Sequence, residues 1–157
     1  MSENPVRAFV AASGDYRWDG VELLRYKEEG SAPFRDVTRQ TLFRRPDMRG
    51  ELRYFEVGPA GYSTLERHEH VHAVMILRGA GQVLVGEQVF PVNTFDLVTV
   101  PPVTWHQFRA GATSPLGFLC LVDAERDKSQ LPSARDLEEM RAHPVVARFL
   151  STKGDRP

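Results

Sequence analysis

The sequence is poor in cysteine and has no long hydrophobic run. Its one cysteine, Cys120, excludes an internal disulfide framework and is typical of a reducing compartment. No apolar segment reaches the 18 residues that a membrane-spanning helix needs, and no charged-then-apolar leader opens the chain. These absences predict a cytoplasmic protein with no membrane partner.

The sequence also lacks an excess of charge of either sign. Its 20 Lys and Arg residues are balanced by 21 Asp and Glu residues, which gives a net charge of -1. Because there is also no helix-turn-helix pattern and no basic tail, a nucleic-acid partner is not expected. The 157 residues, 41% of them hydrophobic, fit one globular domain that buries a core without disulfides.

Turn signals recur every 8–12 residues between residues 51 and 123. This spacing favours an all-β sandwich or barrel. Gly86-Glu87 separates two short apolar runs and predicts a hairpin. Strands are predicted over 51–57, 62–70, 71–77, 82–85, 88–91, 95–100, 105–110 and 116–122, with a turn over 58–61.

The two flanks of this region differ from it in character. Residues 1–50 are predicted to form N-terminal strands and turns that belong to the barrel or to a dimer contact, and residues 124–157 a C-terminal loop and helix. Ser133 is a candidate N-cap because Asp136 follows three residues later. Pro144 is expected to break or restart the helix.

Three histidines alternate along the segment that contains His68, His70 and His72. On a strand they share one face. Histidines two apart lie about 6.6 Å from each other and can reach one metal, but a straight strand separates the outer pair by about 13 Å. Therefore either the chain bends between Glu69 and Val71, or only two of the three bind. A surface patch without a site is less favoured, because the segment leads into an apolar run.

His106 is the natural fourth ligand, because it follows the histidine triplet by one hairpin. Taken alone, a histidine next to a tryptophan is more often structural. The four candidate ligands are therefore His68, His70, His72 and His106.

The segment from Gly61 to Gly79 resembles the first motif of the cupin superfamily. That motif has a glycine, an H-x-H pair, an acidic or histidine ligand, and an apolar strand that ends in a glycine. Here His72 stands where the family usually carries glutamate. This substitution is similar to that of small single-domain cupins with a four-histidine metal site, some of which bind manganese and cleave alkenes oxidatively.

The segment from Phe95 to His106 resembles the second cupin motif. Asp96 and Pro101 stand at their expected positions in it. Phe95 and Val103 occupy the places where the family usually has glycine. The resemblance covers roughly residues 51–123 and implies a cupin barrel, a double-stranded β-helix or jelly roll. The capping pattern at Ser133 adds a short C-terminal helix to this all-β fold.

The same resemblance implies a pocket lined by Phe108, Phe118 and Cys120. On strand parity Phe118 and Cys120 share one face, but the leucines beside them make the opposite face equally apolar. A plain buried role for Cys120 stays open. Arg53 is a candidate to orient an anionic substrate, although a solvated arginine is the commoner case.

Four neutral imidazoles do not neutralise any of the charge of a divalent ion. In an octahedral ion they also leave two coordination positions open. Manganese, iron, nickel, copper and zinc all suit such ligands. The site predicts a metal-dependent dioxygenase or oxidative cleavage enzyme that acts on a small organic substrate. The alternatives are a metal-dependent isomerase or lyase, and a non-catalytic small-molecule or metal sensor. The family resemblance also implies a homodimer.

Overall fold

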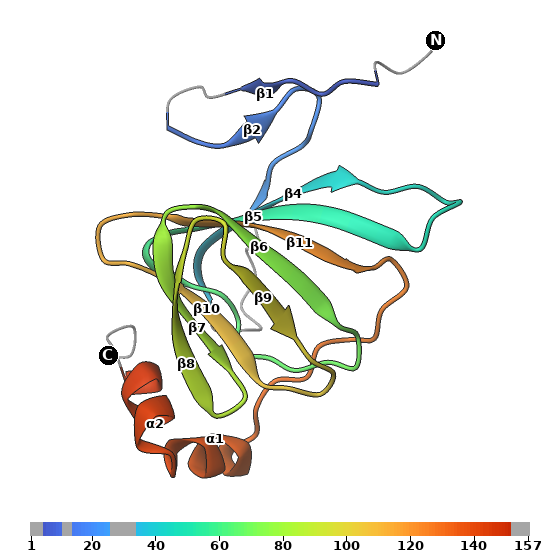
Figure 1. Ribbon diagram of the computed structural model, residues 1–157. Helices are drawn as coiled ribbons and strands as arrows, with labels where there is room; N and C mark the ends of the chain where they lie inside the picture. Colours follow the sequence, from blue (N-terminus) through green and yellow to red (C-terminus); the bar gives the residue numbers. More distant parts are fainter. Residues whose placement is uncertain (1–4, 11–13, 26–33, 152–157) are drawn as a thin grey trace.

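A computed structural model describes residues 5–10, 14–25 and 34–151 of the chain (Figure 1). Within these residues nine strands form one sheet in the order β8-β7-β10-β5-β11-β6-β9, with β4 paired to β5 and β3 to β4. The sheet curls into a barrel-like shape, so the predicted all-β cupin architecture is confirmed. The strands of this sheet are β3 (Leu24–Arg25), β4 (Arg35–Phe43), β5 (Gly50–Tyr62), β6 (His72–Arg78), β7 (Ala80–Val85), β8 (Gln88–Asn93), β9 (Leu97–Val100), β10 (His106–Ala110) and β11 (Leu116–Asp123).

A separate hairpin precedes the main sheet. It consists of β1 (Phe9–Val10) and β2 (Arg17–Trp18), which pair antiparallel. The Trp18 ring lies 5.1 Å from the ring of Tyr54, a fully buried residue of β5. This aromatic contact attaches the hairpin to the main sheet.

Buried apolar side chains form two clusters. The inner core lies inside the barrel, and the outer core lies between the outside of the sheet and the C-terminal helices. The two cores follow from strand alternation, because consecutive side chains point to opposite faces. On β7, Val83 belongs to the inner core and Leu84 to the outer core. The inner core contains Val37, Val57, Val74, Ile76, Val83, Val92, Phe108, Leu116, Phe118, Cys120 and Val122.

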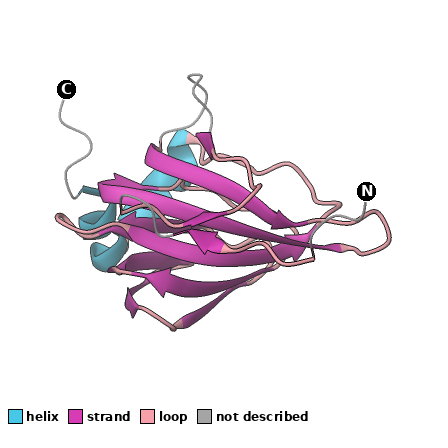
Figure 2. Cartoon of the chain, turned by 90° about the horizontal axis from the view of Figure 1, so that it is seen from above, coloured by secondary structure: helices cyan, strands magenta, loops and turns pink. Residues whose placement is uncertain are grey.

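Two short helices cover the outer core, α1 (Ala134–Arg141) and α2 (Pro144–Ser151). Figure 2 shows them at one end of the curled sheet. The predicted cap is present, since Ser133 Oγ accepts from the Asp136 backbone N–H and the Asp136 carboxylate accepts from the Ser133 N–H at 2.8 Å. Pro144 opens the second helix, where its missing N–H costs nothing. Among the described residues, no helix is long and apolar enough to cross a membrane.

The turn predicted over residues 58–61 is wrong, because β5 continues through it to Tyr62. Ala60 takes a left-handed conformation with φ 57°, and its N–H donates to the Gly111 carbonyl at 2.8 Å. This bend lets β5 leave β11 and reach β10, where Tyr62 pairs with Arg109. The turn-forming residues therefore bend one long strand and do not end it.

Candidate metal centre

Three buried histidines meet inside the barrel. His68, His72 and His106 each place one ring nitrogen so that the three atoms lie within 4.8 Å of one another. His72 opens β6, His106 opens β10, and His68 lies in the connection between β5 and β6. A single cation between such nitrogens can be bound by all three.

The chain bends sharply between His68 and His72. Residues Glu69 and His70 form the bend, and the strand predicted over 62–70 is wrong beyond Tyr62. Asp127, from the segment after β11, accepts backbone hydrogen bonds from the N–H groups of Glu69 at 2.8 Å and His70 at 3.1 Å. Its carboxylate therefore holds the bend that the histidine spacing requires.

Backbone carbonyls fix the orientation of two of the rings. His68 Nδ1 lies 2.8 Å from the His70 carbonyl oxygen, and His106 Nδ1 lies 2.9 Å from the Thr104 carbonyl oxygen. Because a carbonyl only accepts, Nδ1 must carry the proton, and the lone pair is left on Nε2. Support of this kind from outside the ligand shell is common for metal-bound histidines.

The Nε2 atoms of His68 and His72 are buried and have no hydrogen-bond partner. Leaving such atoms unpaired is costly, so a ligand at this point is favoured. His72 uses its other nitrogen, Nδ1, toward Cys120 Sγ at 3.4 Å. The orphaned Nε2 atoms fit a divalent transition metal held by His68, His72 and His106.

His70 lies beside this set but is not one of the three clustered residues. Its ring stacks on His68 with centroids 3.6 Å apart, and its Nδ1 lies 2.6 Å from Asp127 Oδ1. A carboxylate behind one ring nitrogen leaves the other for a metal. His70 as a fourth ligand stays a prediction.

Replacing Asp127 with asparagine is expected to weaken metal binding about 10- to 100-fold. Asparagine keeps one acceptor oxygen for the bend but removes the charge behind His70. Competition with a chromophoric chelator measures the affinity. Asp47→Asn, which alters an exposed carboxylate paired with Arg45, is the matched control. Equal affinities for the two variants would exclude the supporting role of Asp127.

Burial keeps the clustered histidines neutral. It lowers the pKa of His72 to about 2 and that of His106 to about 4, and it also lowers the pKa of His68. Repulsion between the rings lowers these pKa values further. Neutral imidazole is the form that binds a metal.

The metal-free protein is therefore expected to lose stability as the pH falls from 7 to 5. The histidine pKa is about 6.5 in the unfolded chain and lower in the folded one, so the unfolded state takes up more protons in this range. The urea midpoint measured at pH 7, 6 and 5 should decrease, with a flatter dependence for His106→Gln. His143→Gln, at an exposed position, should keep the wild-type dependence. A constant midpoint would show that the rings are not buried as neutral groups.

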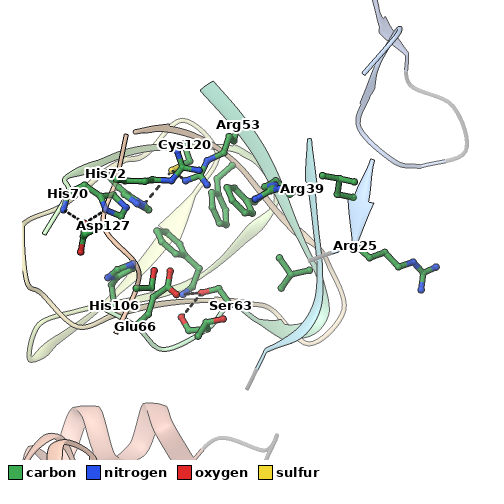
Figure 3. A pocket seen from close by; sticks show the side chains of 18 residues that line it. Arg25, Arg39, Arg53, Ser63, Glu66, His70, His72, His106, Cys120 and Asp127 are labelled. Atoms are coloured by element: carbon green, nitrogen blue, oxygen red, sulfur yellow. Dashed lines mark hydrogen bonds and ion pairs between the residues drawn. The ribbon is translucent and has the colours of Figure 1, made fainter. Parts of the chain in front are cut away.

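A cavity of about 480 Å³ opens next to the histidines. Figure 3 shows His70, His72 and His106 at one end and Arg39 at the other. Stacked phenylalanine rings line the length between them, Phe108 on Phe118 at 4.6 Å and Phe118 near Phe55 at 5.6 Å. The cavity thus has a polar end, an apolar wall and a second polar end.

Cys120 faces this cavity and is 1% exposed. Its Sγ lies 3.4 Å from His72 Nδ1 and 3.7 Å from Arg53 Nη2. Burial raises the pKa of the Cys120 thiol, while the Arg53 charge partly opposes that rise. Leu121, by contrast, is 48% exposed, so the structure settles which face of β11 points inward.

Sequence reasoning did not single out Asp127 or Arg39. Asp127 lies in a charged stretch with nothing to distinguish it from its neighbours, and its partner His70 is 57 positions away. Arg39 is one of several arginines in the N-terminal third. No local pattern marks either residue.

The barrel and its buried histidines define the class of protein. A cupin-domain family profile matches residues 53–122. Two crystal structures superpose closely: a cupin 2 conserved barrel domain protein from Rhodopseudomonas palustris and a cupin-2 domain protein from Rhodospirillum rubrum. The first has 56% identity, covers 92% of this chain and 97% of the other, and gives a TM-score of 0.85. The second has 58% identity, covers 94% and 95%, and gives 0.83. The chain belongs to the cupin superfamily.

One relative with a named activity is similar over almost its whole length. It is the 1-methylthio-D-xylulose 5-phosphate methylsulfurylase of Rhodospirillum rubrum. The two sequences are 60% identical over 147 residues, which cover 94% of each chain.

Proposed function

We propose that this protein is a methylsulfurylase that cleaves the carbon–sulfur bond of 1-methylthio-D-xylulose 5-phosphate. The observation that carries the proposal is a buried thiol, Cys120, inside the cavity and 3.4 Å from His72 of the candidate metal centre. The 60% identity to a protein with that name supports the choice of substrate.

The chemistry of the substrate explains why these groups are needed together. Xylulose is a 2-ketose, so a methylthio group on C1 is bonded next to the C2 carbonyl. Electrons released when the C1–S bond breaks can pass into an enolate. A divalent ion held by the histidines would supply a Lewis acid for the charge that develops on the carbonyl oxygen.

Cys120 is the nucleophile in this proposal. Its thiolate attacks the methylthio sulfur and an S–S bond forms, while the C1–S bond breaks and its electron pair leaves as the enolate. A proton added at C1 then gives 1-deoxy-D-xylulose 5-phosphate, and Cys120 carries a methyl disulfide. Arg53 Nη2 and His72 Nδ1 lie 3.7 Å and 3.4 Å from Cys120 Sγ. N–H donors at these positions stabilise the negative charge of the thiolate.

A small-molecule thiol from solution must complete the cycle. One thiol attacks the mixed disulfide, releases methanethiol and leaves a disulfide on Cys120. A second thiol restores the Cys120 thiolate and departs as an oxidised disulfide. The substrate gains two electrons, which the two thiols supply, and no oxygen is consumed.

The test is an assay for methanethiol with the purified protein, the substrate, a thiol and each of the five candidate metals in turn. We expect one methanethiol for each substrate and two thiols oxidised, without oxygen uptake. No methanethiol with any of the metals would refute the proposal. The dioxygenase prediction is separated by the same assay, since it requires oxygen uptake and no thiol.

A further inference from the structure

We propose that Arg39 binds the phosphate group of the substrate at the end of the cavity remote from the histidines. The inference rests on the proposed function, because it names the residue that binds the phosphate group of that substrate. It makes Arg39 a binding residue that selects phosphorylated sugars.

Arg39 has a charge that nothing in the described part of the chain neutralises. It lies on β4 and lines the cavity, and its Nε is buried without a hydrogen-bond partner. No carboxylate among the residues that the structure describes forms an ion pair with it. A partly buried guanidinium left in this way favours an anion at its open face.

The other arginines that line the cavity are not equivalent. Glu51 is almost fully buried. Its Oε1 accepts a hydrogen bond from Arg126 Nη2 at 3.2 Å and lies 3.6 Å from Arg53 Nε. Arg25 is exposed and points away from the cavity in Figure 3. Arg53 and Arg126 thus share one carboxylate, whereas Arg39 forms no ion pair with any carboxylate of the described residues and, unlike Arg25, is half-buried.

The strand register gives the span between the reacting end and Arg39. Phe118, Phe55 and Arg39 lie side by side on β11, β5 and β4, and Cys120 lies two residues along β11 from Phe118. Two steps of about 4.8 Å across the sheet and two of about 3.3 Å along β11 are perpendicular to each other. They place the Cα atoms of Cys120 and Arg39 roughly 12 Å apart. An arginine side chain covers part of this span, and the carbon chain of a pentulose phosphate covers the rest.

The resulting pose uses all parts of the cavity. The methylthio group meets Cys120, the carbonyl faces the histidines, and the phosphate reaches Arg39. The phenylalanine rings of Phe55 and Phe118 flank the carbon chain between the two ends. A planar guanidinium suits this task because it donates two parallel hydrogen bonds to phosphate oxygens.

The experiment measures binding without turnover, by calorimetry with D-xylulose 5-phosphate and with D-xylulose on the metal-loaded protein. Arg39→Met is expected to weaken binding of the phosphorylated sugar about 30-fold or more. Binding of D-xylulose should stay unchanged, and Arg39→Lys should recover part of the loss. Arg35→Met, an exposed position on the same strand that does not line the cavity, is the matched control and should bind as the wild type does.

Failure of this inference and failure of the proposed function give different results. Equal binding of D-xylulose 5-phosphate by Arg39→Met and wild type overturns the inference, even if methanethiol is released. The inference is also overturned if the wild type does not distinguish the two sugars, or if Arg39→Met loses both equally. Arg39-dependent selection of the phosphorylated sugar in a protein that releases no methanethiol supports the inference and refutes only the reaction.

Discussion

Replacing Cys120 with serine is expected to reduce methanethiol release by at least about 1,000-fold. A hydroxyl is similar in size but is a much weaker nucleophile toward sulfur, so the first step fails. Initial rates for wild type and Cys120→Ser, at equal metal loading and saturating thiol, give the comparison. Without added thiol, wild type should accumulate one methylthio group per chain, visible as a mass increase of the intact protein.

The controls separate chemistry from folding. Cys120 is the one cysteine of the chain, so a methylthio adduct has a single possible site. The serine variant should keep the metal content and the circular dichroism spectrum of the wild type. A Cys120→Ser protein that releases methanethiol at the wild-type rate would show that the sulfur of Cys120 takes no part.

Replacing His106 with alanine is expected to weaken metal binding at least about 100-fold and to abolish turnover at low metal concentration. His106 comes from β10 and the other clustered histidines from the β5–β6 side, so its removal opens the site without altering the bend. The dissociation constant for manganese and zinc, measured against a chelator, gives the size of the effect. A His106→Asn variant, which restores a polar group of smaller size, should not recover the affinity.

His143 provides the matched control for the histidine variants. It lies between the two helices, half exposed, with Nε2 3.3 Å from a carboxylate oxygen of Glu87. His143→Ala should bind the metal as the wild type does. If His106→Ala and His143→Ala had the same affinity, the cation would not be bound in the barrel cluster.

The sheet could be predicted from sequence wherever a turn signal separates two apolar runs. The hairpin at Gly86 is an example, since Val85 pairs with Gln88 across a two-residue turn. The same reasoning failed over residues 58–61, where the turn residues bend one strand from β11 toward β10. Whether glycine and proline end a strand or bend it depends on a partner strand far along the chain, which no local pattern contains.

The site could be predicted in part for the same reason. The alternation of His68, His70 and His72 indicated either a metal shared by all three across a bend or only two ligands, and the structure places a bend at that point. Asp127, which holds the bend, and Arg39, whose Nε has no hydrogen-bond partner among the described residues, come from separate segments. Their significance depends on which carboxylate meets which cation in the folded chain, so it appears only in three dimensions.

Anomalous diffraction from crystals grown with manganese tests the central claim most directly. We predict one peak per chain inside the barrel, within about 2.3 Å of the Nε2 atoms of His68, His72 and His106. The same data show whether His70 supplies a fourth nitrogen. A manganese peak elsewhere on the protein, with the three rings directed away from it, would contradict the metal centre and the reaction that depends on it.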